Sequence, residues 1–192
     1  MIVRGGTVVT PDGERVADVR VVGGAIAEVA PGLDEEEVEV DASGLWVFPG
    51  VVDAHVHFND PGRADWEGGA TGSRALAAGG GTTFVDMPLN AHPPTCDADA
   101  FRAKAATLSA SAVADFALWG GLVPGNVDRL EELADAGVVG FKAFMSPSGI
   151  DDFEAADRET LRAWMARAAA LGLPVAVHAE SPERLLPAAG TG

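Results

Sequence analysis

The 192-residue sequence contains one cysteine and no tyrosine. With Cys96 alone, no disulfide can form within the chain and no cysteine cluster can hold zinc, so any metal must be bound by nitrogen and oxygen. We interpret Cys96 as a free thiol. Basic residues are also scarce, with 13 Lys and Arg against 29 Asp and Glu and a formal net charge of -16. This charge repels phosphate backbones and anionic lipids, so we expect no nucleic-acid and no membrane partner.

Long apolar runs are absent as well. No stretch approaches the ~18 residues that a membrane span requires, and no basic amino-terminal segment is followed by an apolar run, as in a signal peptide. We therefore expect a cytoplasmic protein. The length allows one ordinary domain, or a small domain followed by part of a larger one.

The first 45 residues alternate apolar and polar positions in short bursts that turn residues interrupt. Turn signals include Pro11-Asp12-Gly13 and Gly23-Gly24. This spacing predicts a small antiparallel sheet with tight hairpins. The acidic run 34–37 predicts a solvated loop.

From Val47 onward, short apolar runs alternate with alanine-rich helical patterns. The predicted strands are 47–57, 82–87, 113–119, 138–144 and 174–178, and the predicted helices are 67–78, 98–109, 127–136 and 157–171. Alternating strands and helices indicate a parallel sheet, either doubly wound or a (β/α)8 barrel. Polar residues at several strand ends favour the barrel, where catalytic groups gather at the carboxyl ends of the strands.

The pair His55-Val56-His57 is the most informative feature of the sequence. Side chains alternate along a strand, so both histidines point to the same face, roughly 6.6 Å apart along the backbone. Two imidazoles placed in this way can converge on one metal ion at about 2.0 to 2.1 Å each. The alternative is a pair of strand histidines that bond to the backbone, and the pair by itself leaves both open.

Lys142 and His178 lie in two later predicted strands. Burying a charged ammonium in the apolar strand around Lys142 is costly, so the side chain either extends toward solvent or has a lowered pKa. A neutral lysine can add carbon dioxide to form a carbamate, which can bridge two metal ions. His178 is either a third metal ligand or a hydrogen-bonded core histidine, and Asp53 is either a carboxylate partner of a ligand histidine or an ordinary strand residue.

Three segments, 49–63, 80–90 and 140–149, resemble the cyclic amidohydrolases, in the same order along the chain. The resemblance extends from about Ile2 to Glu180. It implies a metal-dependent (β/α)8 barrel preceded by a small β-sandwich segment. It also implies a centre of two divalent metal ions, usually zinc, with a carboxylated lysine from carbon dioxide; the implied metal ligands are His55, His57, Lys142 and His178.

Within this family, the segments are most similar to those of allantoinases. Dihydroorotases carry an arginine at the position of Asn59, whereas a neutral cyclic ureide such as allantoin suits an asparagine. Hydantoinases carry a tyrosine at the position of Pro147. The implied reaction is the hydrolysis of allantoin to allantoate in purine catabolism, and the candidate substrate-binding residues are Asn59, Asn90, Ser146 and Ser148.

The resemblance implies further groups that this sequence does not contain. The family takes another ligand histidine from its sixth strand and its general base, an aspartate, from the eighth, so the catalytic residue is unknown here. We expect residues 1–46 to form the sandwich segment and residues 47–192 to form the first five strands of the barrel, ending in the helix after the fifth.

Two alternatives to an allantoinase follow. One is an inactive half-barrel that acts only with a complementing chain, and the other is a dihydroorotase-like enzyme in which Arg63 binds the substrate carboxylate. We expect the full-length form to be a homo-oligomer, and the isolated chain to lack turnover.

Overall fold

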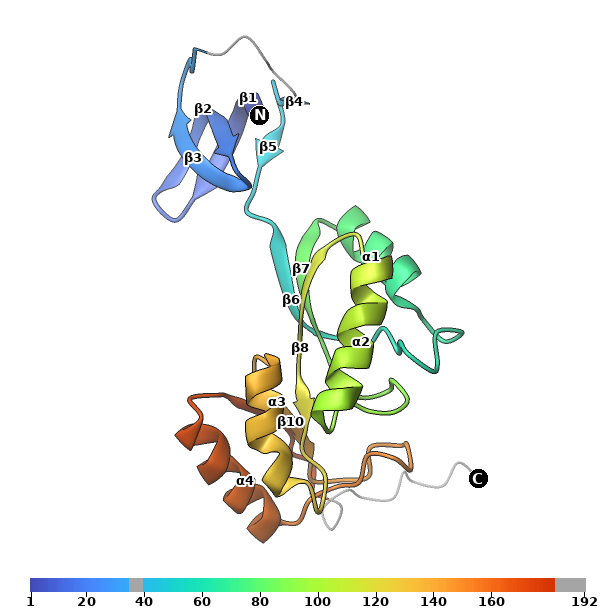
Figure 1. Ribbon diagram of the computed structural model, residues 1–192. Helices are drawn as coiled ribbons and strands as arrows, with labels where there is room; N and C mark the ends of the chain where they lie inside the picture. Colours follow the sequence, from blue (N-terminus) through green and yellow to red (C-terminus); the bar gives the residue numbers. More distant parts are fainter. Residues whose placement is uncertain (35–39, 182–192) are drawn as a thin grey trace, which may run out of the picture. The chain divides into compact units, whose positions relative to one another are not determined.

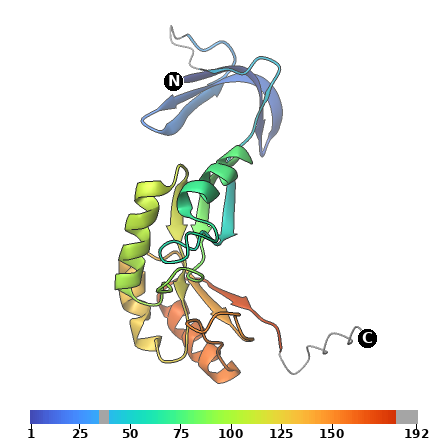
Figure 2. The same cartoon turned by 90° about the vertical axis from the view of Figure 1, so that its right-hand side faces the viewer.

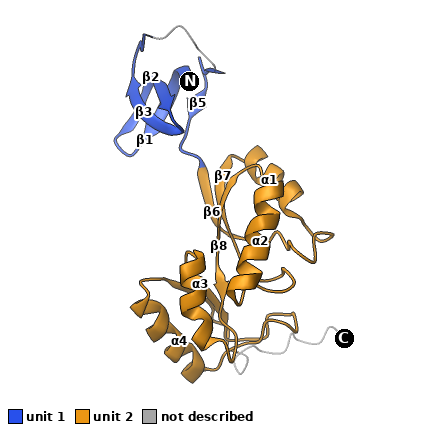
Figure 3. Cartoon of the chain, viewed as in Figure 1, with its two compact units in different colours: residues 1–50 blue, residues 51–192 orange. Residues whose placement is uncertain are grey.

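The computed structural model describes residues 1–34 and 40–181. The helix expected after the fifth strand and most of the predicted acidic loop fall outside these residues. Contacts divide the chain into two compact units, residues 1–50 and 51–192, which Figure 3 distinguishes by colour. In the described ranges, no helix combines the length and the apolar character that crossing a membrane requires.

The first unit is built on one five-stranded sheet. Its strands are β1 (Ile2–Thr10), β2 (Gly13–Val22), β3 (Ala25–Ala30), β4 (Val40–Asp41) and β5 (Trp46–Val47). The first three pair antiparallel, as predicted. The prediction was wrong for β4 and β5, which pair parallel with β1 because they follow one another along the same edge of β1, in the direction of β1 itself. The apolar core of this unit centres on Val8, Ala17 and Val19.

The second unit alternates strands and helices (Figure 1). Its strands are β6 (Val51–Val56), β7 (Gly81–Asp86), β8 (Asp115–Leu118), β9 (Gly120–Gly121), β10 (Phe141–Phe144) and β11 (Val175–His178). Its helices are α1 (Gly69–Ala78), α2 (Ala98–Ser111), η1 (Val127–Arg129), α3 (Leu130–Ala136) and α4 (Arg158–Ala170). The five predicted strands and four predicted helices of this region are all present, with shifted ends.

All strand pairs of the second unit are parallel, in the orders β6-β7-β8 and β9-β10-β11. Only Trp119 separates β8 from β9, and its backbone N–H donates to the Asp86 carbonyl at 3.0 Å. The sheet therefore continues from β6 to β11 in chain order. A doubly wound sheet reverses its strand order at a switch point; the described strands do not, and their order is that of a barrel wall.

Helices α1 and α2 lie along one face of β6, β7 and β8 (Figures 1 and 2). Two aspartates begin helices by accepting backbone N–H groups: Asp97 from Ala100 at 2.8 Å and Asp157 from Thr160 at 2.7 Å. Such caps satisfy amides that the first helical turn leaves free. Helix α3 ends at Gly137, whose φ of 109° requires glycine.

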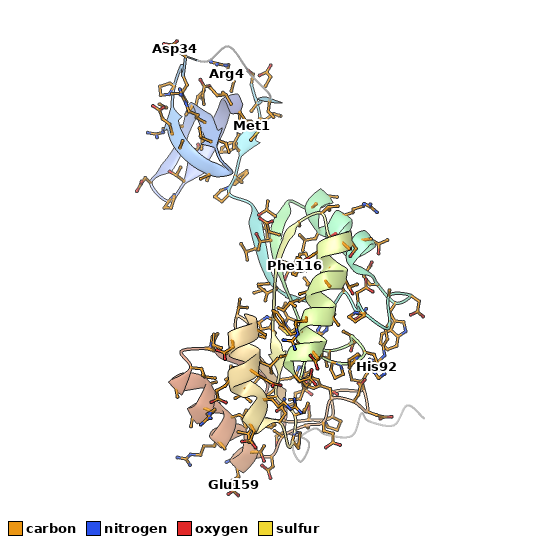
Figure 4. The ribbon with its side chains drawn as sticks, in the orientation of Figure 1. Met1, Arg4, Asp34, His92, Phe116 and Glu159 are labelled. Carbon is orange, nitrogen blue, oxygen red and sulfur yellow. The ribbon has the colours of Figure 1, made fainter. Side chains whose placement is uncertain are left out.

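Aromatic and aliphatic side chains fill the space between strands and helices. Phe84 packs edge-on against Phe58 and stacks on Phe116, which is labelled in Figure 4, with Leu108 of α2 beside them. Cys96 forms no disulfide, and burial raises the pKa of its thiol to about 12. The structure agrees with its interpretation as a free thiol, and the thiol stays protonated at neutral pH.

Candidate metal centre

The two histidines of the His-x-His pair converge at the end of β6. Their Nε2 atoms lie 3.3 Å apart. The Nδ1 atom of His57 lies 2.8 Å from the carbonyl oxygen of Leu89. A carbonyl only accepts, so Nδ1 carries the proton and the Nε2 atom of His57 keeps its lone pair. Bonding to the backbone was the alternative to metal binding for these histidines. In His57 it occupies only Nδ1 and leaves Nε2 available as a metal ligand.

The separation of the two Nε2 atoms fits a shared metal ion. Two nitrogens bound at about 2.0 to 2.1 Å to a tetrahedral ion lie about 3.3 to 3.4 Å apart. The observed 3.3 Å matches that spacing. The two Nε2 atoms are thus spaced as two ligands of one ion would be.

Lys142, on β10, is buried and does not extend to solvent, with 4% of its surface exposed. Its Nζ atom lies 4.8 Å from the centre of the Phe144 ring. Burial lowers the pKa of Lys142, because an apolar environment disfavours the ammonium form. A larger share of this amine is therefore neutral than of a surface lysine, as carbamate formation requires.

His178 ends β11 opposite Phe144 of β10. Its ring stacks on that of Phe144, with centroids 5.0 Å apart and an interplanar angle of 9°. Its Nε2 atom lies 3.3 Å from Oε1 of Glu180. Lys142 and His178 thus contact the same aromatic ring, which brings these two predicted ligands from neighbouring strands to one place.

The four predicted ligands share one electrostatic environment. Partial burial lowers the pKa of His55, the charges of His57, Lys142 and His178 lower it further, and Asp53 opposes them. Asp53 itself accepts the backbone N–H of His55 at 3.0 Å. Across residues 1–34 and 40–181, no three His, Cys, Asp or Glu side chains are grouped to hold a metal ion.

Of the four predicted substrate-binding residues, the structure brings two into contact with each other. Asn59, which is buried, accepts from the side-chain amide of Asn90 at 3.1 Å, so these two lie together. Ser146 is also buried, and its hydroxyl lies 3.4 Å from Oε2 of Glu180. Ser148 donates to the carbonyl of Phe153 at 2.6 Å, within its own loop.

Arg63 is occupied by contacts within the protein. It donates to the carbonyl of Asn90 at 2.7 Å and to Oδ2 of Asp152 at 3.2 Å. The same carboxylate oxygen lies 2.6 Å from Nδ1 of His92, labelled in Figure 4. Burial raises the pKa of Asp152, but His92 and Arg63 together hold it below its usual value. The guanidinium that the dihydroorotase-like alternative needs for a substrate already has a carboxylate partner.

One buried ion pair beside the centre was missed from the sequence. Asp86 ends β7 and is fully buried, and Lys104 of α2 is 1% exposed; the two lie 2.9 Å apart. Burial raises the pKa of Asp86 and lowers that of Lys104, whereas their mutual attraction opposes both changes. A signal for Lys104 was present, because it stands between Ala100 and Leu108 at helical spacing, on the stripe of α2 that faces the sheet.

Residues 46–189 match a family model described as "Amidohydrolase family". The chain is 62% identical over 182 residues to an allantoinase of Rubrobacter xylanophilus and 58% identical over 182 residues to one of Solibacter usitatus. These matches cover 94% and 95% of this chain and 40% of each relative. The chain thus spans about 40% of the length of these relatives.

Among solved structures, the L-hydantoinase (dihydropyrimidinase) from Arthrobacter aurescens superposes with a TM-score of 0.87 at 37% identity. The superposition covers 93% of this chain and 40% of that structure. A D-hydantoinase gives a TM-score of 0.80 at 32% identity over the same share of this chain. With the family model matching well over half of the sequence, these findings show that the chain belongs to the amidohydrolase family.

Proposed function

We propose that the chain supplies the amino-terminal part of a metal-dependent enzyme that hydrolyses a cyclic amide, with allantoin as the substrate. The observation that carries the proposal is the 3.3 Å separation of the His55 and His57 Nε2 atoms, with His57 held by Leu89 in the tautomer that binds metal. The high identity to allantoinases supports the choice of substrate.

His55, His57, Lys142 and His178 are the residues we propose to hold two divalent metal ions, most simply zinc, with Lys142 as its carbamate. When bound, such ions lower the pKa of a water molecule and polarise the carbonyl that it attacks. The protein's own contribution is to prepare the ligands: the Leu89 carbonyl holds the His57 ring, and burial lowers the pKa of Lys142, which favours the neutral amine that a carbamate requires.

For substrate recognition we propose Asn59 and Asn90 on one side and Ser146 and Ser148 on the other. Amide and hydroxyl groups suit a neutral ureide, which offers both N–H donors and carbonyl acceptors. The paired Asn59 and Asn90 side chains are preorganised by their mutual contact. The division into a sandwich segment (1–46) and a barrel part (47–192), the cytoplasmic location and the homo-oligomer of a longer form remain predictions.

Zinc binding by the full 192-residue chain tests the centre directly. We expect zinc affinity, measured against a competing chelator, to fall at least tenfold in H55A and in H57A. H92A is the matched control, because His92 lies outside the proposed centre and contacts Asp152. We expect bicarbonate to raise the zinc affinity of the unmodified chain but not that of K142M. Equal zinc affinity of H57A and the unmodified chain would contradict the proposed centre.

Allantoin turnover tests the reaction. The chain is assayed with zinc and bicarbonate, alone and mixed with the segment of the Rubrobacter xylanophilus allantoinase that this chain does not match. We expect allantoate formation in the mixture and none by the chain alone. Steady hydrolysis by the chain alone would disprove the need for groups from elsewhere, and dihydroorotate turnover in the mixture without allantoin turnover would favour the dihydroorotase-like alternative.

A further inference from the structure

The buried pair of Asp86 and Lys104 contacts the backbone of Phe58, which follows His57, and the backbone of Met87. Oδ1 of Asp86 accepts the backbone N–H of Phe58, the residue after His57, at 3.0 Å. Nζ of Lys104 lies 2.9 Å from Oδ2 of Asp86 and donates to the carbonyl of Met87 at 2.5 Å. The two side chains therefore tie the segment after β6 to the segment after β7.

These are the two segments whose relative position sets the orientation of the His57 ring. The ring belongs to the first segment, and the carbonyl that holds its Nδ1 atom, that of Leu89, belongs to the second. Two further backbone bonds join this part of the chain to the segment after β7: the Met87 N–H donates to the Val56 carbonyl at 2.9 Å, and the His92 N–H donates to the Pro61 carbonyl at 2.8 Å. A small shift of either segment would move the Leu89 oxygen away from Nδ1.

The chemistry of the pair also needs explanation. Burying two opposite charges costs desolvation that their attraction offsets only in part, and apolar residues of similar volume often stabilise a protein equally well. A packed helix of alanine and leucine needs no lysine at the position of Lys104. The two backbone contacts give the pair a role that apolar side chains would not provide.

We propose that Asp86 and Lys104 form a positioning pair, which holds His57 in the Nδ1-protonated, metal-binding orientation by fixing the backbone of Phe58 against that of Met87. Neither residue is among the proposed metal ligands or substrate-binding residues. The expected change in zinc affinity rests on the proposed metal centre, whereas the orientation of the His57 ring can be measured without metal. Partners that orient a ligand histidine typically change metal affinity 10- to 100-fold when they are lost.

The test replaces both members of the pair, D86L/K104M, which leaves no unpaired buried charge and removes both backbone contacts. The first measurement is the tautomer of His57 in the metal-free 192-residue chain, from the 15N shifts of its imidazole. We expect the Nδ1-protonated form in the unmodified chain and a mixture of tautomers in the variant. The second is zinc affinity, which we expect to fall at least tenfold.

Two further variants separate positioning from general destabilisation. D86N keeps an oxygen for the Phe58 N–H and leaves Lys104 to donate to Met87, so we expect the His57 tautomer to be retained and the zinc affinity to change less than threefold. D18N is the matched control: Asp18 is a buried carboxylate of the first unit, paired with Arg4. We expect it to leave the tautomer and zinc affinity unchanged.

Each outcome bears on a different statement. A folded D86L/K104M with an unchanged His57 tautomer and unchanged zinc affinity would overturn the positioning role. If that variant does not fold, K104Q takes its place, because its side chain is one bond too short to reach Met87. K104Q must then shift the His57 tautomer in the same direction, and an unchanged tautomer overturns the proposal. If the unmodified chain binds no zinc, the proposed centre fails, and the metal-free tautomer still decides the positioning role.

Discussion

Each of the two units buries an aspartate beside a cation, and the two sites differ in what the carboxylate holds. Asp18 accepts the backbone N–H groups of Gly5 and Leu33 and lies 3.2 Å from Arg4, whose side chain is one-third exposed. Asp86 lies beside a lysine that is 1% exposed. The first carboxylate joins loop and strand within a sheet, whereas the second joins two strand ends beside a candidate site. A similar residue pair serves folding in one unit and the proposed ligand geometry in the other.

The largest difference between the two pairs should appear when only the cation is removed. K104M leaves the Asp86 carboxylate fully buried without its counterion, which typically costs about 3 to 5 kcal/mol. R4M leaves Asp18 with two backbone N–H donors, and the Arg4 side chain that is removed is one-third exposed, so we expect a clearly smaller loss. The free energies of unfolding of both variants, from urea denaturation, measure the difference. Equal losses of unfolding free energy in K104M and R4M would show that deeper burial does not make the loss of the cation more costly.

The next comparison uses two glycines that are closely packed. A Cβ at position 72 would lie 2.4 Å from Cε1 of Phe58, and a Cβ at position 6 would lie 2.6 Å from Cγ2 of Val47. Phe58 is 6% exposed and packed against Phe84, so its ring has little room to move. Val47 is only partly buried. Overpacking of this kind costs about 1 to 3 kcal/mol.

We therefore expect G72A to destabilise the chain by about 1 to 3 kcal/mol, and G6A to destabilise it less, because Val47 can rotate away. G72A should also weaken zinc binding, since Phe58 follows His57 directly. Thermal unfolding and chelator competition measure the two effects. A G72A chain as stable as the unmodified one would show that the Phe58 ring can yield.

The sequence allowed the second unit to be predicted more fully than the first. Runs such as Phe141–Phe144, buried throughout, and helices bounded by Asp97 or Gly137 follow local rules that act over a few residues. The parallel pairing of β4 and β5 with β1 does not follow from such rules, because it joins residues 37 to 39 positions apart.

The same distinction applies to the candidate site. The strand period placed His55 and His57 on one face, and the 3.3 Å separation agrees with it. The roles of Leu89, Asp86 and Lys104 could not be derived in this way. They depend on contacts between residues 17 to 32 positions apart, which no local pattern specifies.

Removing the helix cap of α2 separates a loss of stability from a loss of His57 positioning. D97A removes the acceptor of the Ala100 N–H and should cost about 1 kcal/mol, as for other caps. Lys104 lies two turns further along the same helix. If the pair acts by position, D97A lowers the free energy of unfolding but leaves the His57 tautomer unchanged. A changed tautomer in D97A would indicate that any loosening of α2 disturbs the site, and the ion pair would then have no special role.

The smallest effect concerns the ion pairs of Asp152, which lie partly exposed between loops of the second unit. Burial raises the pKa of Asp152, but His92 and Arg63 hold it below the value of an unfolded chain. Between those two pKa values the unfolded chain binds more protons than the folded one. The stabilisation is therefore complete above the unfolded pKa and is lost as the pH falls through the folded pKa.

Comparing D152N with the unmodified chain isolates this contribution. We expect the two to differ in stability at neutral pH and to converge as the pH falls below the usual range of a carboxyl group, since protonation removes the same charge that the substitution removes. Because surface ion pairs contribute little, the difference at neutral pH should stay below about 1 kcal/mol. A difference that persists unchanged at low pH would show that Asp152 stabilises its loop through its shape and hydrogen bonds, and not through its charge.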